Sequence, residues 1–179
     1  MISKKPSLPL KTFLVLSADK LIMNSTGNNE PKLSLMHCDN RDHIQQKMIQ
    51  LDQEQMDYKW ESKTWKEILD KPYFEYWTLM SGQELIGFAL YQLLPDGCAH
   101  LLKILVAEKF RNRGMADKIF SHSKQELSKR GMVSLYLEVA QDNEKAINLY
   151  LKHGLKILNI KKRFYSDGKN ACAMQLKLN

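Results

Sequence analysis

The sequence predicts a mixed α/β (α+β) domain in which helices cover the faces of one sheet. Two observations lead to this fold class. Apolar residues recur at strand spacing in some segments of the 179-residue chain and at helix spacing in others. Turns rich in Pro, Gly and Asn separate these segments. Their order is strand, helices, three or four strands, helix, strand, helix and two closing strands.

The length and the hydrophobic content of 44% fit a single domain with a sizeable core. The formal net charge of +7 favours an anionic ligand, a nucleic acid or an acidic surface, or else only keeps the surface soluble. The cysteines Cys38, Cys98 and Cys172 are widely spaced, so we expect no metal site, no disulfide framework and a reducing cytoplasm. No apolar run has the length of a membrane span.

The chain is expected to begin with an N-terminal extension, residues 1–31, followed by the main domain, residues 32–179. Within the extension, the segment from Thr12 to Leu16 could form a short strand. A run of Asn, Ser, Thr and Gly residues ending at Pro31 indicates a loop between the extension and the domain.

The first half of the main domain combines two helices with four strands. The expected elements are a strand over 33–36, helices over 41–55 and from about 62 to 70, and strands over 74–80, 85–93 and 99–106. Ile44, Met48 and Leu51 recur at helical intervals and predict the first helix. Turn residues at 81–84 and 95–97 separate the later strands.

In the second half, helices and strands alternate. The expected elements are a helix over 115–130, a strand over 133–139, a helix over 144–153 and closing strands over 155–160 and 171–178. Gly131 follows basic residues in the last turn of the first helix, which is typical of a helix C-terminus. The strand over 133–139 alternates too little to be half exposed, so we expect it to be central.

The segment from Ile104 to Ala116 carries the most informative local pattern. An apolar run that predicts a buried strand ends in a basic loop, and the loop opens an amphipathic helix. Backbone N–H groups at a helix N-terminus favour a bound anion. Gly114 lets the backbone approach that anion, and Arg111 and Arg113 add positive charge. These residues predict a cradle for a pyrophosphate.

This loop begins a resemblance to a known family. The Q/R-x-x-G-x-G/A loop of the GNAT superfamily of N-acetyltransferases resembles Arg111-Asn112-Arg113-Gly114-Met115-Ala116. A second series resembles the second half of the GNAT sequence pattern, and more narrowly that of the bacterial ribosomal-protein alanine N-acetyltransferases. This series is Leu137-Glu138-Val139, Asn143, Ala146-Ile147, Leu149-Tyr150 and Gly154-Leu155. The chain departs from that subfamily at Ala140, where an arginine is usual, and over 166–171, where an acidic pair is missing.

The resemblance implies a mostly antiparallel sheet of six to seven strands, with helices on both faces and a splay between the fourth and fifth strands. It implies an N-acetyltransferase that moves the acetyl group of acetyl-CoA to a primary amine by direct attack. An α-amine has an ordinary pKa of about 7.7–8.0 against about 10.4 for lysine, which favours a protein or peptide N-terminus. The alternatives are a small-molecule amine (polyamine, amino acid or aminoglycoside) and a non-catalytic CoA-binding module. We expect no nucleic-acid or membrane partner, and both a monomer and a homodimer stay open.

The resemblance also indicates which residues hold acetyl-CoA. The main chain of Ile104, Leu105 and Val106 would pair with the pantetheine arm, with their side chains in the core. A bulge at these three residues would splay the central strands and open a slot for the cofactor. The backbone amides of the loop would hold the pyrophosphate through Arg111, Asn112, Arg113, Gly114, Met115, Ala116 and Asp117. Asn143 would contact CoA or an ordered water, or else cap a helix.

The same comparison implies Glu138 as the general base, acting directly or through a water, and Tyr150 as the general acid for the CoA thiolate. Because Glu138 lies in an apolar strand, desolvation should raise its pKa, unless the carboxylate faces solvent or caps another element. Core packing is the alternative role for Tyr150. Phe164 and Tyr165 would line the acceptor site, or else form a half-exposed strand pair.

Two further sets of side chains have less specific expectations. The histidines lack ligand spacing, so we expect surface or core positions for His100, His122 and His153. The aromatic-rich region from Trp60 to Trp77 is expected to be core, or a lid over the acceptor.

Overall fold

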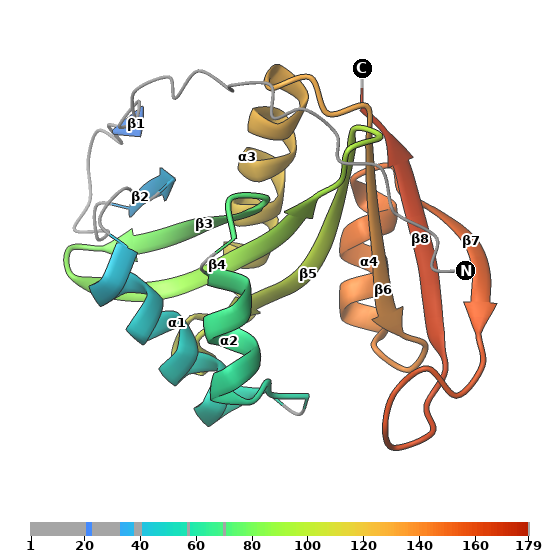
Figure 1. The fold of residues 1–179 in the computed structure, drawn as a ribbon, viewed down its shortest axis with the longest axis horizontal. Coiled ribbons are helices and arrows are strands. Elements are labelled where there is room, and N and C mark those ends of the chain that lie inside the picture. The colour runs from blue at the N-terminus through green and yellow to red at the C-terminus, as the bar shows by residue number, and fades with distance from the viewer. Residues whose placement is uncertain (1–20, 23–32, 38–40, 57, 70, 179) are drawn as a thin grey trace, which may run out of the picture.

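The computed structural model describes residues 21–22, 33–37, 41–56, 58–69 and 71–178. Within these residues, one sheet and four α-helices form the fold (Figure 1). The helices are α1 (Arg41–Gln55), α2 (Ser62–Leu69), α3 (Met115–Lys129) and α4 (Glu144–Lys152), with a short 3-10 helix η1 (Glu108–Phe110). The strands are β1 (Leu21–Ile22), β2 (Leu33–His37), β3 (Phe74–Ser81), β4 (Glu84–Leu93), β5 (Cys98–Val106), β6 (Ser134–Ala140), β7 (Lys156–Lys161) and β8 (Ala171–Lys177).

In the described part of the chain, the sheet has eight strands in the order β1-β2-β3-β4-β5-β6-β8-β7. Every neighbouring pair is antiparallel except β5 and β6, which are parallel. The seven strands expected between residues 33 and 178 are confirmed. The eighth is the two-residue strand β1, which pairs with β2 through Leu21 and Leu35. The strand expected over 12–16 lies outside the described residues.

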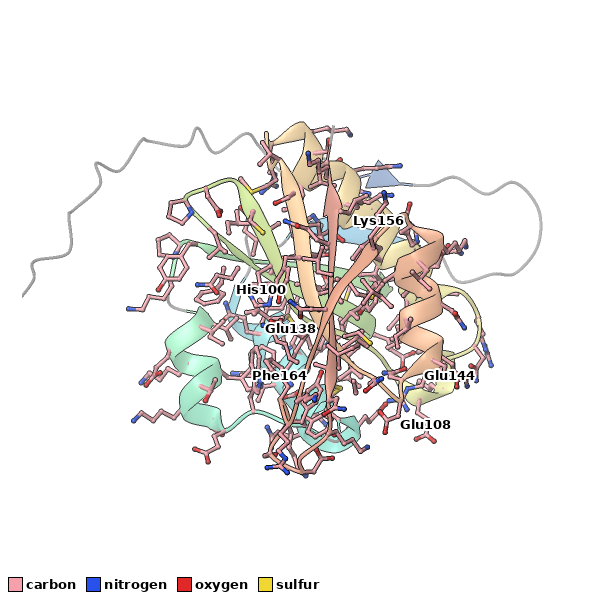
Figure 2. The ribbon with its side chains drawn as sticks, turned by 90° about the vertical axis from the view of Figure 1, so that its right-hand side faces the viewer. His100, Glu108, Glu138, Glu144, Lys156 and Phe164 are labelled. Atoms are coloured by element: carbon pink, nitrogen blue, oxygen red, sulfur yellow. The ribbon has the colours of Figure 1, made fainter. Side chains whose placement is uncertain are left out.

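The helices cover both faces of the sheet, with α1 and α2 on one face and α3 and α4 on the other (Figures 1 and 2). Residues on each strand point alternately to the two faces, so each face has its own core. Under α1 and α2, Met48 and Trp65 pack with Phe88. Under α3 and α4, Phe120 and Tyr150 belong to a second core. The helical spacing that predicted α1 is confirmed by this burial.

The parallel pairing of β5 with β6 covers less than half of β5. It runs from Cys98 opposite Ser134 to Leu101 opposite Leu137, whereas β5 continues to Val106. The two strands therefore separate over their C-terminal ends. The splay expected between the fourth and fifth strands of the main domain is confirmed at this position.

A β-bulge on β5 lies where the separation starts. On β4, Leu90 is opposite Lys103 and Tyr91 is opposite Leu101, so Leu102 is the extra residue. A bulge bends its strand and increases the local twist. The bulge was expected nearer the end of the strand, and its position at Leu102 coincides with the last residue pair between β5 and β6.

Beyond the bulge, β5 lies close against β4. A Cβ atom added at Gly87 of β4 would lie 2.5 Å from the Leu105 carbonyl oxygen. A real Cβ does not fit at that distance, so only glycine allows this approach. The Ala107 amide also donates to the Ile86 carbonyl at 2.8 Å. The end of β5 is thus held to β4 while it diverges from β6.

Candidate active site

The splayed part of β5 directs main-chain groups toward β6. In an antiparallel pair, successive residues direct their N–H and C=O groups alternately to one neighbour and then away from it. Because Ala107 bonds to β4, the main-chain groups of Ile104 and Val106 face the opposite side. Among the described residues, β6 has none in register there. An extended ligand would find unpaired strand backbone at Ile104 and at the Val106 amide, whereas the Val106 carbonyl accepts from Arg111.

The predicted phosphate loop forms a turn before α3. Asn112 and Gly114 have φ values of +58° and +74°, in the left-handed region that favours glycine. The first hydrogen bond of helix α3 runs from the Lys118 amide to the Gly114 carbonyl. The amides of Met115, Ala116 and Asp117 lie before Lys118 in the first turn, where backbone N–H groups have no partner within the helix. The strand, loop and helix N-terminus that the sequence predicted are present.

Two loop side chains have structural bonds. Arg111, which was expected to add charge to the loop, donates from Nε to the Val106 carbonyl at 2.9 Å, so its charge lies at the start of the loop. Asp117 accepts from Lys152 and His153 of the α4 end, both at 2.9 Å. These bonds lower the pKa of Asp117, Lys152 contributing most. Arg111 therefore fastens the loop to β5, and Asp117 fastens α3 to α4.

Asn143 caps the N-terminus of α4. Its Oδ1 accepts from the Ala146 amide at 3.1 Å. This is the structural alternative named for Asn143, and it fixes the start of the helix that carries Tyr150.

Tyr150 projects from α4 into the core beneath β6. Only 4% of the residue is exposed, and its ring lies 5.3 Å from that of Phe120. Burial raises the pKa of the hydroxyl, and Tyr165 raises it further. The hydroxyl thus keeps its proton throughout the physiological range. No described residue bonds to it, so it can donate to a ligand.

Glu138 lies on the opposite face of β6, with three side chains around its carboxylate. His100 Nε2 lies 2.7 Å from Oε2, while Tyr136 Oη and Lys161 Nζ donate to Oε1 at 2.9 and 2.6 Å. In Figure 2, Glu138 lies between His100 and Phe164. Its side chain is 11% exposed. Glu138 and Tyr150 therefore approach the splay from opposite faces of the sheet.

The expected rise in the pKa of Glu138 was wrong. Burial does raise it, but the bonds from His100, Lys161 and Tyr136 outweigh burial and lower the pKa to about 2. Two of the donors, His100 and Lys161, come from β5 and β7, which are distant in sequence. The carboxylate is ionised at any physiological pH. His100, expected to be a surface or core histidine, is part of this site.

Phe164 and Tyr165 lie in the turn between β7 and β8, so the alternative of a half-exposed strand pair is wrong. Phe164 is 44% exposed, and the Lys161 ammonium lies 5.2 Å from its ring centre. Tyr165 stacks on Tyr58 of the α1–α2 loop with ring centres 4.5 Å apart. The Tyr58 hydroxyl donates to Asp167 at 2.7 Å. The two loops thus meet on the face that carries Glu138.

A buried ion pair holds the α1–α2 loop over the bulge. Lys103 Nζ lies 2.6 Å from Asp52 Oδ1, and the side chains are 3% and 0% exposed. The other oxygen, Oδ2, accepts from the Trp60 amide and from Trp65 Nε1 at 3.0 and 2.8 Å. Lys103 also donates to the Tyr58 carbonyl at 3.0 Å. No sequence motif had pointed to this pair.

Two kinds of feature are absent from the described residues. Nowhere in them do three His, Cys, Asp or Glu side chains gather as a metal site would require. None of the described helices is both long and apolar enough to cross a membrane.

Known proteins resemble this chain in sequence and fold. Residues 44–155 match the model of the Acetyltransferase (GNAT) family. The [ribosomal protein bS18]-alanine N-acetyltransferase of Escherichia coli K12 is 30% identical over 125 residues, which cover 68% of this chain and 83% of that enzyme. An N-alpha-acetyltransferase of Sulfurisphaera tokodaii is 32% identical over 95 residues, or 51% of this chain and 57% of that protein.

The structural comparison agrees. The crystal structure of the ribosomal-protein-S18-alanine N-acetyltransferase from Escherichia coli superimposes with a TM-score of 0.74 at 25% identity, over 82% of this chain and 94% of that one. The family model spans more than half of the sequence, including the splayed strand, the glycine loop and both faces of β6. This chain accordingly belongs to the GNAT family of acetyltransferases, and it is an acyltransferase that uses acetyl-CoA.

Proposed function

We propose that this enzyme acetylates the N-terminal α-amine of a protein or peptide. The charge balance on the acceptor face carries the proposal. Glu138 is paired there with Lys161, at 2.6 Å, and the single Lys169 pairs with both Asp142 and Asp167, so the excess is one carboxylate. A polyamine or aminoglycoside carries several positive charges and needs several unpaired carboxylates. A single amine on a peptide does not.

The names of the relatives support the same acceptor. The Escherichia coli relative is named for an alanine of ribosomal protein bS18, and the Sulfurisphaera relative for an N-α-amine. Phe164, exposed beside Glu138, and the stacked Tyr58 and Tyr165 offer aromatic surface for the residues that follow a peptide N-terminus.

On the donor side, we assign the pantetheine arm to the main chain of Ile104, Leu105 and Val106. The pyrophosphate falls to the amides from Asn112 to Asp117, at the N-terminus of α3. Bound acetyl-CoA supplies the thioester carbon that the amine attacks. Tyr150 donates its hydroxyl proton toward the leaving sulfur, and Glu138 acts from the other face of β6, on the side of the incoming amine. The attack is direct, with no acyl-enzyme.

We also infer a cytoplasmic enzyme, because ribosomal proteins are the named substrates of its relatives. Cys98 and Cys172, both buried and free, are compatible with a reducing compartment. Residues 1–31 are proposed to extend a domain of residues 32–179, and the enzyme is proposed to act as a monomer or homodimer.

The function is tested by thiol release from acetyl-CoA. The acceptors are peptides that begin with Ala, Ser, Met or Asp, free lysine, spermidine and an aminoglycoside. We expect activity with a peptide and none above background with the small amines. The control is the same peptide with a blocked α-amine and an internal lysine. Equal activity on the blocked peptide, or activity on small amines alone, would contradict the proposal.

The phosphate cradle is tested by Gly114→Val. We expect the Kd of acetyl-CoA to rise at least tenfold, because a β-branched side chain is strained at φ +74° and projects where the ligand approaches. Gly131→Val is the matched control, since Gly131 ends the same helix with φ +81° and equally open space. Calorimetry should show a loss of acetyl-CoA affinity for Gly114→Val and none for Gly131→Val. Equal affinities of the two variants would refute the cradle.

A further inference from the structure

The carboxylate of Glu138 is occupied by the protein itself. His100, Tyr136 and Lys161 all lie within hydrogen-bond distance of its two oxygens. An ionised carboxylate only accepts, so His100 Nε2, 2.7 Å away, carries a hydrogen and donates it. In a neutral imidazole this leaves the lone pair on Nδ1. No described residue bonds to Nδ1.

We propose that His100 Nδ1 accepts the proton of the acceptor ammonium, through a water, and that Glu138 positions the imidazole. The proposal rests on the proposed function and names the base of that reaction. It gives the two residues the roles of base and orienting carboxylate in a histidine–carboxylate pair.

The surroundings of Glu138 disfavour it as the proton acceptor. The hydrogen bonds to its two oxygens hold its pKa at about 2, far below the ordinary α-ammonium value of about 7.7–8.0. The Nδ1 atom of His100, by contrast, bonds to no described residue. A base works best when its pKa lies near the working pH.

The location of His100 suits this role. It is opposite Tyr136 in the last register pairs before the splay, and its ring meets the Tyr136 ring edge-on at 5.2 Å. The imidazole is about a quarter exposed, so a water can reach it. On β5 itself, Lys103 lies on the same face of the sheet as His100, and its charge is paired with Asp52. Lys161 of β7 pairs with Oε1 of Glu138. The other oxygen, Oε2, therefore faces the imidazole of His100.

The step balances in protons and electrons. One ammonium N–H bond breaks as an Nδ1–H bond forms on His100. The lone pair of the free amine then forms the C–N bond to the thioester carbon, and the C–S bond breaks with its electrons on sulfur. The nitrogen loses one more proton as the amide forms. That proton ends on the sulfur, with the help of the Tyr150 hydroxyl. The imidazolium returns its proton to solvent.

The decisive variant is His100→Gln, whose amide can still donate to Glu138 but cannot take a proton. We expect kcat/KM at pH 7 to fall about 100-fold, with acetyl-CoA affinity and thermal unfolding unchanged. Wild-type kcat/KM should fall with decreasing pH as the base becomes protonated. In His100→Gln the part of this fall that the base causes should be absent. His122→Gln, on α3, is the matched control and should behave as wild type.

A rescue experiment separates chemistry from structure. In His100→Ala, added imidazole should raise kcat/KM at least tenfold, and the increase should be larger above pH 7 than below it. A wild-type pH profile in His100→Gln, or no rescue in a folded His100→Ala that still binds acetyl-CoA, would overturn the proposal.

Nitrogen NMR of the histidines in the wild-type enzyme provides a test that needs no acceptor. We expect His100 to be protonated at Nε2 and bare at Nδ1 near pH 8, and the opposite tautomer would overturn the proposal. If the wild-type enzyme acetylates no amine, the proposed function fails on its own, and the tautomer still decides whether His100 is poised as described.

Discussion

Asp52→Asn is expected to lower the free energy of unfolding by about 3–5 kcal/mol, because it leaves a buried ammonium without its counter-charge. Asp52 and Lys103 are almost wholly buried, with their charged atoms 2.6 Å apart. Burial lowers the pKa of Lys103, and the bond from Asp52 opposes that shift. Asn still accepts from the Trp65 indole, so charge loss dominates. Urea unfolding followed by tryptophan fluorescence measures the change.

A double-mutant cycle isolates the charge. Lys103→Met in the Asp52→Asn background removes the unpaired ammonium and should restore most of the lost stability. The surface pair of Lys63 and Glu67, 3.9 Å apart and largely exposed, is the comparison. Glu67→Gln should change stability by less than about 0.5 kcal/mol. A loss below about 1 kcal/mol in Asp52→Asn, or additive losses in the double variant, would contradict the expectation.

The same pair matters for the acceptor site. Lys103 and Asp52 hold the Tyr58 carbonyl and the Trp60 amide, and Tyr58 stacks on Tyr165. We therefore expect a folded Asp52→Asn enzyme at low temperature to lose peptide affinity before it loses acetyl-CoA affinity.

Tyr150→Phe is expected to lower kcat by about 10²- to 10³-fold without changing the Kd of acetyl-CoA. The phenyl ring retains the packing against Phe120, so the variant should fold as wild type. Because burial raises the pKa of Tyr150, its ionisation should cause no loss of rate below about pH 10. A rate measured in a single turnover, with acetyl-CoA affinity measured by calorimetry, checks both parts.

Tyr91→Phe is the matched control for Tyr150→Phe. Tyr91 is fully buried in the same core, and its hydroxyl bonds to Ser123 at 2.7 Å. Loss of that hydroxyl should reduce stability by about 1 kcal/mol and leave kcat unchanged. If Tyr150→Phe retains wild-type turnover, the ring serves packing alone and Tyr150 leaves the mechanism.

The elements and the geometry of the loop proposed to hold acetyl-CoA could be predicted because their signals are local. Apolar spacing predicts where strands and helices run, and Gly114 with its neighbours indicates a helix N-terminus open to an anion. The family resemblance, which the glycine loop and the Glu–Asn–Tyr series carry, also predicted the splay between two strands of the sheet. The bulge at Leu102 carries no residue signal, since any residue can be the extra one.

The proposed acceptor site could be predicted only in part. Sequence indicated Glu138 but not its partners, and it placed His100 among the unremarkable histidines. His100 and Lys161 are 38 and 23 residues from Glu138 in the chain. They reach it because β5 and β7 lie on either side of β6 and β8 in the sheet.

By itself, the sequence determined which segments form strands and helices, where the glycine turn opens α3, and that the chain carries the residues of a GNAT acetyltransferase. Only the tertiary structure decided the charge state of Glu138, the burial of Asp52 with Lys103, and the meeting of Tyr58 with Tyr165. The physical reason is the range of the interactions. Backbone preference and apolar spacing act over a few residues, whereas the free energy of a buried charge depends on every donor that the fold brings to it.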